Sequence, residues 1–236
     1  MFAQLAPWLK TARNALLDLL FPPRCVACRR SGNWFCAACQ AQIQPIRPPL
    51  CAHCGRPSTR TPCPFCHKQP LAMNGTRAVA FFDHPLRQAI HALKYEQRTE
   101  LAAPLGDLLS DYLRAHPLPA DALIAVPLHP TRERERGYNQ AALLAQAIHT
   151  RLGLPVWTDA LTRVRATRTQ TELNAAERRT NVAEAFAATA RVAGARLVLV
   201  DDVLTTGATM NACAVALREC GAQTVWGVAL ARPRLD

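Results

Sequence analysis

Eight of the ten cysteines fall in four Cys-x-x-Cys pairs between residues 25 and 66. The pairs are Cys25/Cys28, Cys36/Cys39, Cys51/Cys54 and Cys63/Cys66. Each pair makes a tight turn that aims two sulfurs at one ion, and two such turns complete a closed tetrahedral zinc site. Residues 21–70 otherwise lack the periodic apolar pattern that builds a core, so this segment needs a cross-link, such as a bound metal, to fold stably. The spacing therefore predicts two structural zinc sites.

The grouping of the pairs follows from their order along the chain. Seven residues separate the first two pairs and eight separate the last two. Neighbouring pairs are therefore expected to share an ion, and the alternative is an interleaved arrangement. His53 and His67 lie beside the pairs, but eight thiolates already fill two sites. We interpret both imidazoles as surface or outer groups and not as ligands.

The first 20 residues predict a short amphipathic helix that stops at Pro22. Lys10, Arg13 and Asp18 interrupt its apolar pattern, and no small-residue cleavage site follows. The segment therefore differs from a secretion signal, and no apolar run approaches the roughly 18 residues that cross a bilayer. Metal-binding thiols in a reducing compartment explain the cysteines better than disulfides do. We expect a cytoplasmic protein without a transmembrane segment.

The formal net charge of +11 counts every cysteine as neutral. Residues 1–70 carry nine Lys or Arg and one acidic residue. Each zinc ion with four thiolates contributes a charge of −2, so two such sites lower the net charge of the chain from +11 to about +7. The protein stays basic enough to attract polyanions. The zinc segment is then either a folding staple or a basic platform, with Trp34 and Phe35 available to stack on nucleic acid.

The chain from residue 71 onward alternates between strand and helix patterns. Strands are expected at 76–82, 121–127, 195–200 and 223–231, and helices at 85–95, 100–115, 137–152 and 208–220. Strands that alternate with helices form crossover units, so we expect an α/β fold whose parallel sheet is covered on both faces. The chain is thus divided into an N-terminal helix (1–20), a double zinc ribbon (21–70) and an α/β domain (71–236).

The stretch LVLVDDVLTTGAT, residues 197–209, carries the strongest functional signal. Asp201 and Asp202 follow a buried strand at the edge where open α/β sheets bind ligands. Vicinal carboxylates there accept hydrogen bonds from a pair of sugar hydroxyls. The loop that follows enters a helix, and its backbone N–H groups suit a phosphate. Its residues are Thr205, Thr206, Gly207, Ala208 and Thr209. A 5-phosphoribosyl ligand is expected, because a plain capped helix leaves the two acids unexplained.

These residues resemble the phosphoribosyl pyrophosphate signature of the type I phosphoribosyltransferases, a hydrophobic run followed by D-D-x-x-T-T-G-x-T. The resemblance implies that Asp201 and Asp202, as the catalytic pair, hold the ribose 2′ and 3′ hydroxyls. It implies that Thr205 through Thr209 wrap the 5′-phosphate, and that Mg²⁺ accompanies the ligand. It also implies a type I phosphoribosyltransferase-like parallel sheet flanked by helices, with a mobile loop over the site.

Several further motifs narrow the resemblance to the ComF family, the competence-protein relatives of phosphoribosyltransferases. They are the four cysteine pairs, LKY (93–95), VPLHPTRERERGYNQA (126–141) and RVRATRTQTELNAAERRTNVAEAF (163–186). The likeness covers essentially the whole chain. It implies a double zinc-ribbon domain before the transferase-like domain, and a role in DNA uptake and natural competence. Single-stranded DNA and competence or DNA-processing proteins are the further partners it suggests.

Four other features are candidates for the same site. His129 follows a predicted strand, where type I transferases place a pyrophosphate contact. Arg136 begins R-G-Y-N-Q, and either neutralises a diphosphate or has a structural role; Asn139 or Gln140 either bonds the ligand or orders the loop. Residues 163–181 form either a closing cationic loop or an exposed polar one. Lys94 is either a distal phosphate contact or a helix-terminal charge.

Three functions fit these features. The first is a phosphoribosyltransferase, in which a nitrogen nucleophile displaces pyrophosphate at the anomeric carbon. The second is a non-catalytic protein that responds to phosphoribosyl pyrophosphate and binds single-stranded DNA. The third is an adaptor of the competence machinery. No acceptor-binding segment is evident in the sequence, so the acceptor stays open.

Overall fold

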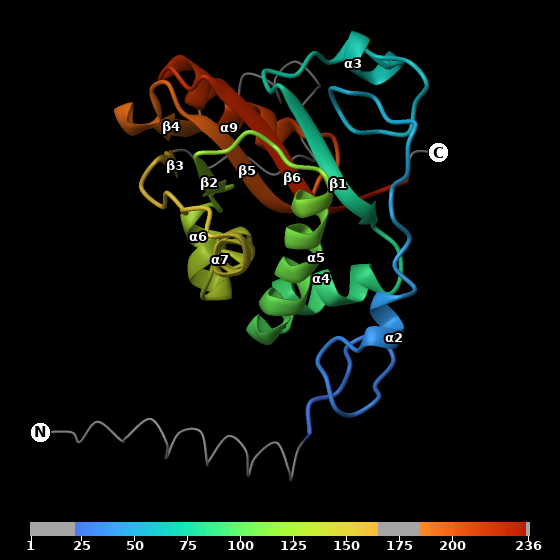
Figure 1. Ribbon diagram of the computed structural model, residues 1–236. Helices are drawn as coiled ribbons and strands as arrows, with labels where there is room; N and C mark the ends of the chain where they lie inside the picture. Colours follow the sequence, from blue (N-terminus) through green and yellow to red (C-terminus); the bar gives the residue numbers. More distant parts are fainter. Residues whose placement is uncertain (1–21, 165–184, 235–236) are drawn as a thin grey trace, which may run out of the picture.

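The computed structural model describes residues 22–164 and 185–234, and its centre is a parallel β-sheet (Figure 1). The strand order is β1 (Gly75–Phe81), β6 (Thr224–Arg232), β5 (Arg196–Val203) and β2 (Ala122–Ala125). Every neighbouring pair is parallel. A bridge between Leu123 and Val156 adds one more parallel contact beyond β2. The four expected strands and their parallel arrangement are confirmed.

Helices cover both faces of this sheet. The longer ones are α4 (Leu86–Tyr95), α5 (Ala102–Ala115), α7 (Gln140–Leu152) and α9 (Ala208–Glu219). The shorter ones are α2 (Ala37–Gln40), α3 (Pro64–Lys68), η1 (Thr99–Leu101), α6 (Pro130–Arg136) and η2 (Ala190–Val192). Buried side chains of α4, α5 and α7 share one core cluster, and those of α9 lie in a second cluster on the other face. None of the helices within the described ranges is long and apolar enough to cross a bilayer.

The central strand β5 shows why its sequence is a continuous aliphatic run. Val198 and Val200 pack in the cluster with α4, α5 and α7, whereas Leu197 and Leu199 pack in the cluster with α9. Successive side chains of a strand point to opposite faces. Because helices cover both faces, both sets of side chains are apolar, as in other parallel sheets.

Two local features differ from the expected elements. The helix expected from residue 137 begins at Gln140, because Gly137 (φ 85°) ends the separate helix α6 and Asn139 caps α7. A small antiparallel pair, β3 (Leu161–Arg163) and β4 (Phe186–Ala188), was not expected. Most of the predicted cationic loop at 163–181 lies outside the described residues, as does the predicted helix at 1–20.

The cysteine-rich segment runs along the outer edge of β1. Pro45 forms an antiparallel bridge with Ala80, the Ile46 N–H donates to the Val79 carbonyl (3.1 Å), and the Phe81 N–H donates to the Gln44 carbonyl (2.9 Å). The α2 and α3 regions lie at opposite ends of this contact (Figure 1). An edge strand with free N–H and C=O groups is prone to unwanted pairing. Residues 44–46 therefore complete part of the β1 edge.

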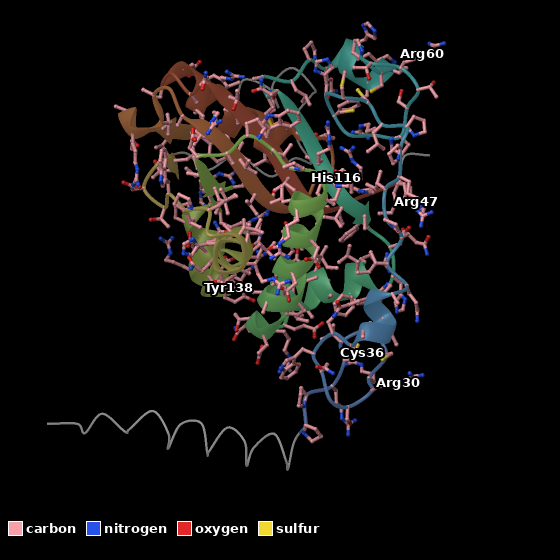
Figure 2. All side chains as sticks on the ribbon, viewed as in Figure 1. Arg30, Cys36, Arg47, Arg60, His116 and Tyr138 are labelled. Atoms are coloured by element: carbon pink, nitrogen blue, oxygen red, sulfur yellow. The ribbon has the colours of Figure 1, made fainter. Side chains whose placement is uncertain are left out.

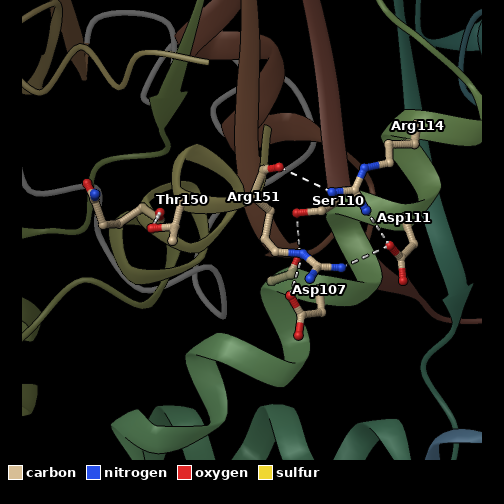
Figure 3. A network of polar contacts seen from close by, with 8 residues as sticks. Asp107, Ser110, Asp111, Arg114, Thr150 and Arg151 are labelled. Carbon is tan, nitrogen blue, oxygen red and sulfur yellow. Dashed lines mark hydrogen bonds and ion pairs between the residues drawn. The ribbon is translucent and has the colours of Figure 1, made fainter. Parts of the chain in front are cut away.

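Helices α5 and α7 pack closely, and a polar network closes their exposed side (Figure 3). Arg151 of α7 contacts Asp107 (3.1 Å) and Asp111 (3.5 Å) of α5, and Arg114 donates to the Arg151 carbonyl (3.1 Å). These groups are exposed, so each pair contributes little to stability. The close approach depends on Gly106, because a Cβ atom there would lie 2.3 Å from the Ala147 Cβ.

The Gly106→Ala substitution is expected to lower the free energy of unfolding by about 2 kcal/mol, because the added methyl group forces the two helices apart. Urea unfolding measures the loss. The Gly106→Ala/Ala147→Gly double variant removes the clash and exchanges one helical glycine for another, so it should unfold near the wild-type midpoint. A single Gly106→Ala variant as stable as the wild type would contradict this packing.

Candidate functional site

The acid pair lies inside strand β5, close to its carboxyl end. Asp201 continues the alternation of Leu197 and Leu199, so its side chain faces the α9 side of the sheet. Asp202 continues that of Val198 and Val200 and faces the α4 side. The structure therefore separates the two carboxylates across the end of the strand instead of presenting them side by side.

Asp202 forms a buried ion pair with helix α4. Its carboxylate is 2.5 Å from the Lys94 Nζ, and the two side chains are 3% and 20% exposed respectively. The removal of two charges from water is costly unless they compensate one another closely. Lys94 is thus first of all the counter-charge of Asp202. The LKY motif at the end of α4 was the only sequence signal for this residue.

Asp201 is half-buried at the carboxyl edge of the sheet. Its Oδ1 accepts a hydrogen bond from the Asp202 N–H (2.8 Å). Burial raises the pKa of the Asp201 carboxyl well above its ordinary value, and the neighbouring Asp202 charge raises it further. The Asp201 charge in turn adds to the burial that raises the pKa of Cys213 in α9, in agreement with an Asp201 side chain on the α9 side.

The loop from Leu204 to Gly207 joins β5 to α9. Gly207 has φ 82°, a left-handed conformation that favours glycine, and it is the N-cap of α9. The Thr206 hydroxyl accepts a hydrogen bond from the Ala208 N–H (3.3 Å). The N–H groups of Thr205, Thr206 and Gly207 donate to no acceptor within the described residues. Free amides at a helix N-terminus are a suitable environment for an anion.

The R-G-Y-N-Q motif orders the chain after β2. Asn139 caps α7 by accepting from the Ala141 N–H (2.9 Å), and its Nδ2 donates to the Val126 carbonyl (3.0 Å). The Tyr138 hydroxyl donates to the Leu93 carbonyl of α4, and Arg136 donates to the buried Gln140 side chain. Asn139 and Gln140 are therefore engaged within the protein, and Tyr138 connects the start of α7 to α4.

His129 is positioned by helix α6. It is the N-cap of this helix, and its Nδ1 accepts a hydrogen bond from the Thr131 N–H (3.2 Å). The imidazole is half-buried and leaves its other ring nitrogen free of hydrogen bonds to described residues. The structure places it between β2 and a cationic helix.

A cavity of about 340 Å³ opens between α4 and α6. Its lining residues are Lys94, Tyr95, Gln97, Arg132, Glu135 and Arg136. Three cations against one acid give the lining an excess of positive charge. Lys94 belongs both to this cavity and to the ion pair with Asp202, so the cavity adjoins the end of β5. Of these residues, sequence reasoning named Lys94 and Arg136 as candidates for phosphate contacts but did not select Tyr95 or Gln97.

The eight paired cysteines form two groups of four within the described part of the chain. The groups are Cys25, Cys28, Cys36 and Cys39, and Cys51, Cys54, Cys63 and Cys66, with all sulfurs of a group within 4.8 Å of one another. Four ligands about 2.3 Å from a tetrahedral zinc ion are roughly 3.8 Å apart. The measured S···S separations of 3.5 to 3.9 Å fit that geometry. Neighbouring pairs thus share a site, and both groups fit structural zinc.

The sulfurs within each group differ in pKa, and burial raises the pKa of Cys39, Cys54 and Cys66. Burial would raise the pKa of Cys25 and of Cys51, but hydrogen bonds from backbone amides outweigh it and lower each pKa to about 6. A thiolate is the form that binds zinc. His53 and His67 are exposed and belong to neither group.

The Lys94→Met substitution is expected to lower the free energy of unfolding by about 3 kcal/mol, because it leaves the Asp202 carboxylate buried without a counter-charge. Urea unfolding at neutral pH measures the effect. Lys94→Met/Asp202→Asn removes the buried charge as well and should recover most of the loss. Lys68→Met, at an exposed lysine, is the matched control, and an equal loss in both single variants would refute the ion pair's role.

Elemental analysis of the purified protein should give two zinc ions per chain, because each group of four thiolates closes one site. The Cys51→Ser/Cys54→Ser variant should retain one ion. Cys220→Ser should retain two, since that thiol lies outside both groups and donates to the Ala188 carbonyl (3.4 Å). A wild-type content of one zinc ion is incompatible with the grouping.

Two family models match the chain. A double zinc ribbon domain matches residues 16–69, and a phosphoribosyl transferase domain matches residues 139–234. Their order along the chain is the one expected from the motifs. Together with the parallel sheet and the two four-cysteine groups, these matches confirm the predicted fold class.

Curated relatives match nearly the full length of the chain. The DNA utilization protein YhgH of Salmonella typhi is 37% identical over 219 residues, which cover 88% of this chain and 96% of that protein. Competence protein F of Haemophilus influenzae is 35% identical over 224 residues, which cover 88% and 97%. Among solved structures, the Bacillus subtilis glutamine phosphoribosylpyrophosphate amidotransferase is 23% identical, with a TM-score of 0.39, and the match covers 54% of this chain and 26% of that one.

Proposed function

The chain belongs to the ComF family of competence proteins, and from this premise we propose that it binds phosphoribosyl pyrophosphate with Mg²⁺ while serving DNA uptake. The names of the relatives, competence protein F and DNA utilization protein, support the role in DNA uptake. The phosphoribosyl transferase model supports the ligand class.

The observation that carries the ligand proposal is the position of Asp201 beside a loop with free amides. Asp201 and helix α9 lie on the same side of the sheet, and the loop Thr205–Thr209 enters α9 directly. The Asp201 carboxylate accepts hydrogen bonds from ribose hydroxyls. The amides of Thr205, Thr206 and Gly207 donate to the 5′-phosphate. One sugar phosphate then satisfies the three loop amides, which have no acceptor among the described residues, and adds donors to an Asp201 carboxylate that already accepts from the Asp202 N–H.

The diphosphate of the ligand is assigned to the cavity between α4 and α6. Lys94, Arg132 and Arg136 line it and offer positive charge for two phosphates. Mg²⁺ prefers oxygen ligands and is commonly held by one or two carboxylates together with substrate phosphates. Asp201 supplies a protein oxygen for it on the ribose side. Asp202 acts indirectly in this arrangement, because its charge holds Lys94 at the border between cavity and ribose.

The reaction that follows is a transfer of the phosphoribosyl group to a nitrogen nucleophile, with pyrophosphate as the leaving group. The protein contributes by holding the reactants in position and by neutralising the charge that develops on pyrophosphate. The acceptor stays open. Steady release of pyrophosphate with a defined acceptor distinguishes this transferase from a protein that only binds the ligand.

A DNA-binding role is the second candidate, and the exposed arginines of the cysteine-rich segment favour it. Arg30, Arg47 and Arg60 point outward along one side of the molecule (Figure 2). A row of cations on one side suits a phosphate backbone, and such binding weakens as salt rises. If joint substitution of these three arginines lowers the affinity for single-stranded DNA, the result would support this role. If the protein binds competence proteins but no DNA, the result would support an adaptor role instead.

We also propose a domain organisation with an N-terminal helix (1–20), a double zinc ribbon (21–70) and a phosphoribosyltransferase-like domain (71–236). Zinc sites made of eight thiolates suit a reducing compartment, which we propose to be the cytoplasm.

Calorimetric titration with phosphoribosyl pyrophosphate and Mg²⁺ tests the ligand proposal. Asp201→Asn should weaken binding about tenfold or more, because the amide is a poorer acceptor and offers no charge to the cation. Binding by the wild type should also weaken as pH falls, since Asp201 has a raised pKa and binds in its ionised form. Asp159→Asn, at an exposed acid that pairs with Arg191, serves as the control. Equal affinity in the two variants would exclude Asp201 from the ribose site.

A further inference from the structure

Arg56 lies between the second group of cysteines and the loop Thr205–Thr209. It stands two residues after Cys54, its carbonyl accepts a hydrogen bond from the Cys51 N–H (2.8 Å), and it is 5% exposed. Its guanidinium lies 3.9 Å from the ring centre of Phe65, between Cys63 and Cys66 in sequence. Its Nη2 donates to the Thr205 carbonyl at 3.3 Å, a contact between residues 149 positions apart. A single side chain thus joins the cysteine-rich segment to the loop before α9.

A second buried arginine lies beside the same cysteines. Arg232, at the end of β6, is 3% exposed, and its Nη1 donates to the Cys54 carbonyl (2.7 Å). Arg56 and Arg232 are the buried arginines among the described residues. The Nε atoms of both are buried and have no hydrogen-bond acceptor among the residues that the structure describes. Buried cations of this kind need an anion close by.

With zinc bound, the second group of thiolates would supply that anion. Zn²⁺ with four thiolates carries a net charge of −2, and the two guanidinium groups carry +2. Zinc-bound sulfurs also accept N–H hydrogen bonds, and such outer contacts tune metal affinity. The first group, around Cys28 and Cys36, differs, because its neighbours Arg29 and Arg30 are exposed. The charge of the first site is therefore compensated mainly by water and not by a buried arginine.

The second group is also fixed rigidly to the sheet. The Thr76 N–H donates to the His53 carbonyl (2.7 Å), and the Thr76 hydroxyl donates to the Cys54 carbonyl (3.0 Å). A Cβ atom at Gly55 would lie 2.4 Å from the Thr76 carbonyl oxygen, so only glycine permits this approach. Arg56 therefore reaches Thr205 from a fixed base on β1.

We propose that Arg56 is a positioning residue through which the second zinc site, with Arg56 and Arg232 as its buried counter-charges, holds the phosphate loop Thr205–Thr209 in shape. The ligand part of this inference rests on the proposed function. The two zinc sites then have different duties. The first serves the fold, and the second serves the fold and the ligand loop together.

Three measurements on the zinc-loaded full chain test the proposal. The first is the rate of zinc transfer to a chromogenic chelator. The second is hydrogen exchange at the Leu204 and Asn211 amides, which flank the loop and bond the Ala231 and Gly207 carbonyls (2.8 Å each). The third is the affinity for phosphoribosyl pyrophosphate with Mg²⁺. If the wild type fails to bind that ligand, the proposed function fails, and the first two measurements still decide the role of Arg56.

Arg56→Gln should release one of the two zinc ions about 10- to 100-fold faster, as expected when an outer contact of a metal site is lost. Exchange at Leu204 and Asn211 should rise, and ligand affinity should fall about tenfold. Lys68→Gln, at an exposed cation of the same segment, should match the wild type. Equal zinc release and equal exchange in the Arg56 and Lys68 variants would overturn the proposal.

Arg56→Lys separates charge from contact if Arg56→Gln folds poorly. Lysine keeps the positive charge but lacks the planar fork that spans Phe65 and Thr205. Zinc release should stay within about threefold of the wild type, while exchange at Leu204 and Asn211 rises. Unchanged exchange in Arg56→Lys would show that the Thr205 contact does not hold the loop.

Discussion

The burial of β5 on both faces is the constraint on which the rest of the structure depends. An aliphatic strand covered by α9 on one side and by α4, α5 and α7 on the other has one place for polar groups, its carboxyl end. The alternation of the strand then assigns each acid a different environment. Asp202 enters the core beside Lys94, and Asp201 stays half-open on the side of the loop. In the candidate site, one acid is therefore paired within the core and the other is available to a ligand.

Two zinc sites at the ends of one segment give the molecule a second kind of support. The residues between them pair with the edge of β1, so the sites brace the sheet from outside. The second site reaches further, through Arg56, to the carbonyl of Thr205. In the proposed arrangement, metal binding is linked to ligand binding, since Arg56, one of the two buried arginines beside the thiolates, also contacts the loop. This linkage joins residues of both halves of the chain.

The elements with strong local patterns were predictable, and the long-range pairings were not. Apolar periodicity located the four strands of the sheet, and the spacing of the cysteines predicted which pairs share an ion. Three-residue strands such as β3 carry no period, so they were missed. The role of Asn139 as the N-cap of α7 was visible only in the structure. The helix therefore starts three residues later than expected. The Lys94–Asp202 and Arg56–Thr205 contacts depend on how distant segments pack, which no local pattern encodes.

The antiparallel bridge between Pro45 and Ala80 has a consequence for how the protein can be dissected. A truncated chain that starts at residue 71 would uncover the hydrogen-bonding groups of β1 and the half-buried ring of Phe81. Such an unpaired strand edge promotes self-association. Loss of function in that fragment would report aggregation as readily as the absence of zinc. Point substitutions at single cysteine ligands keep the edge of β1 covered. They therefore test the contribution of zinc to function without exposing that edge.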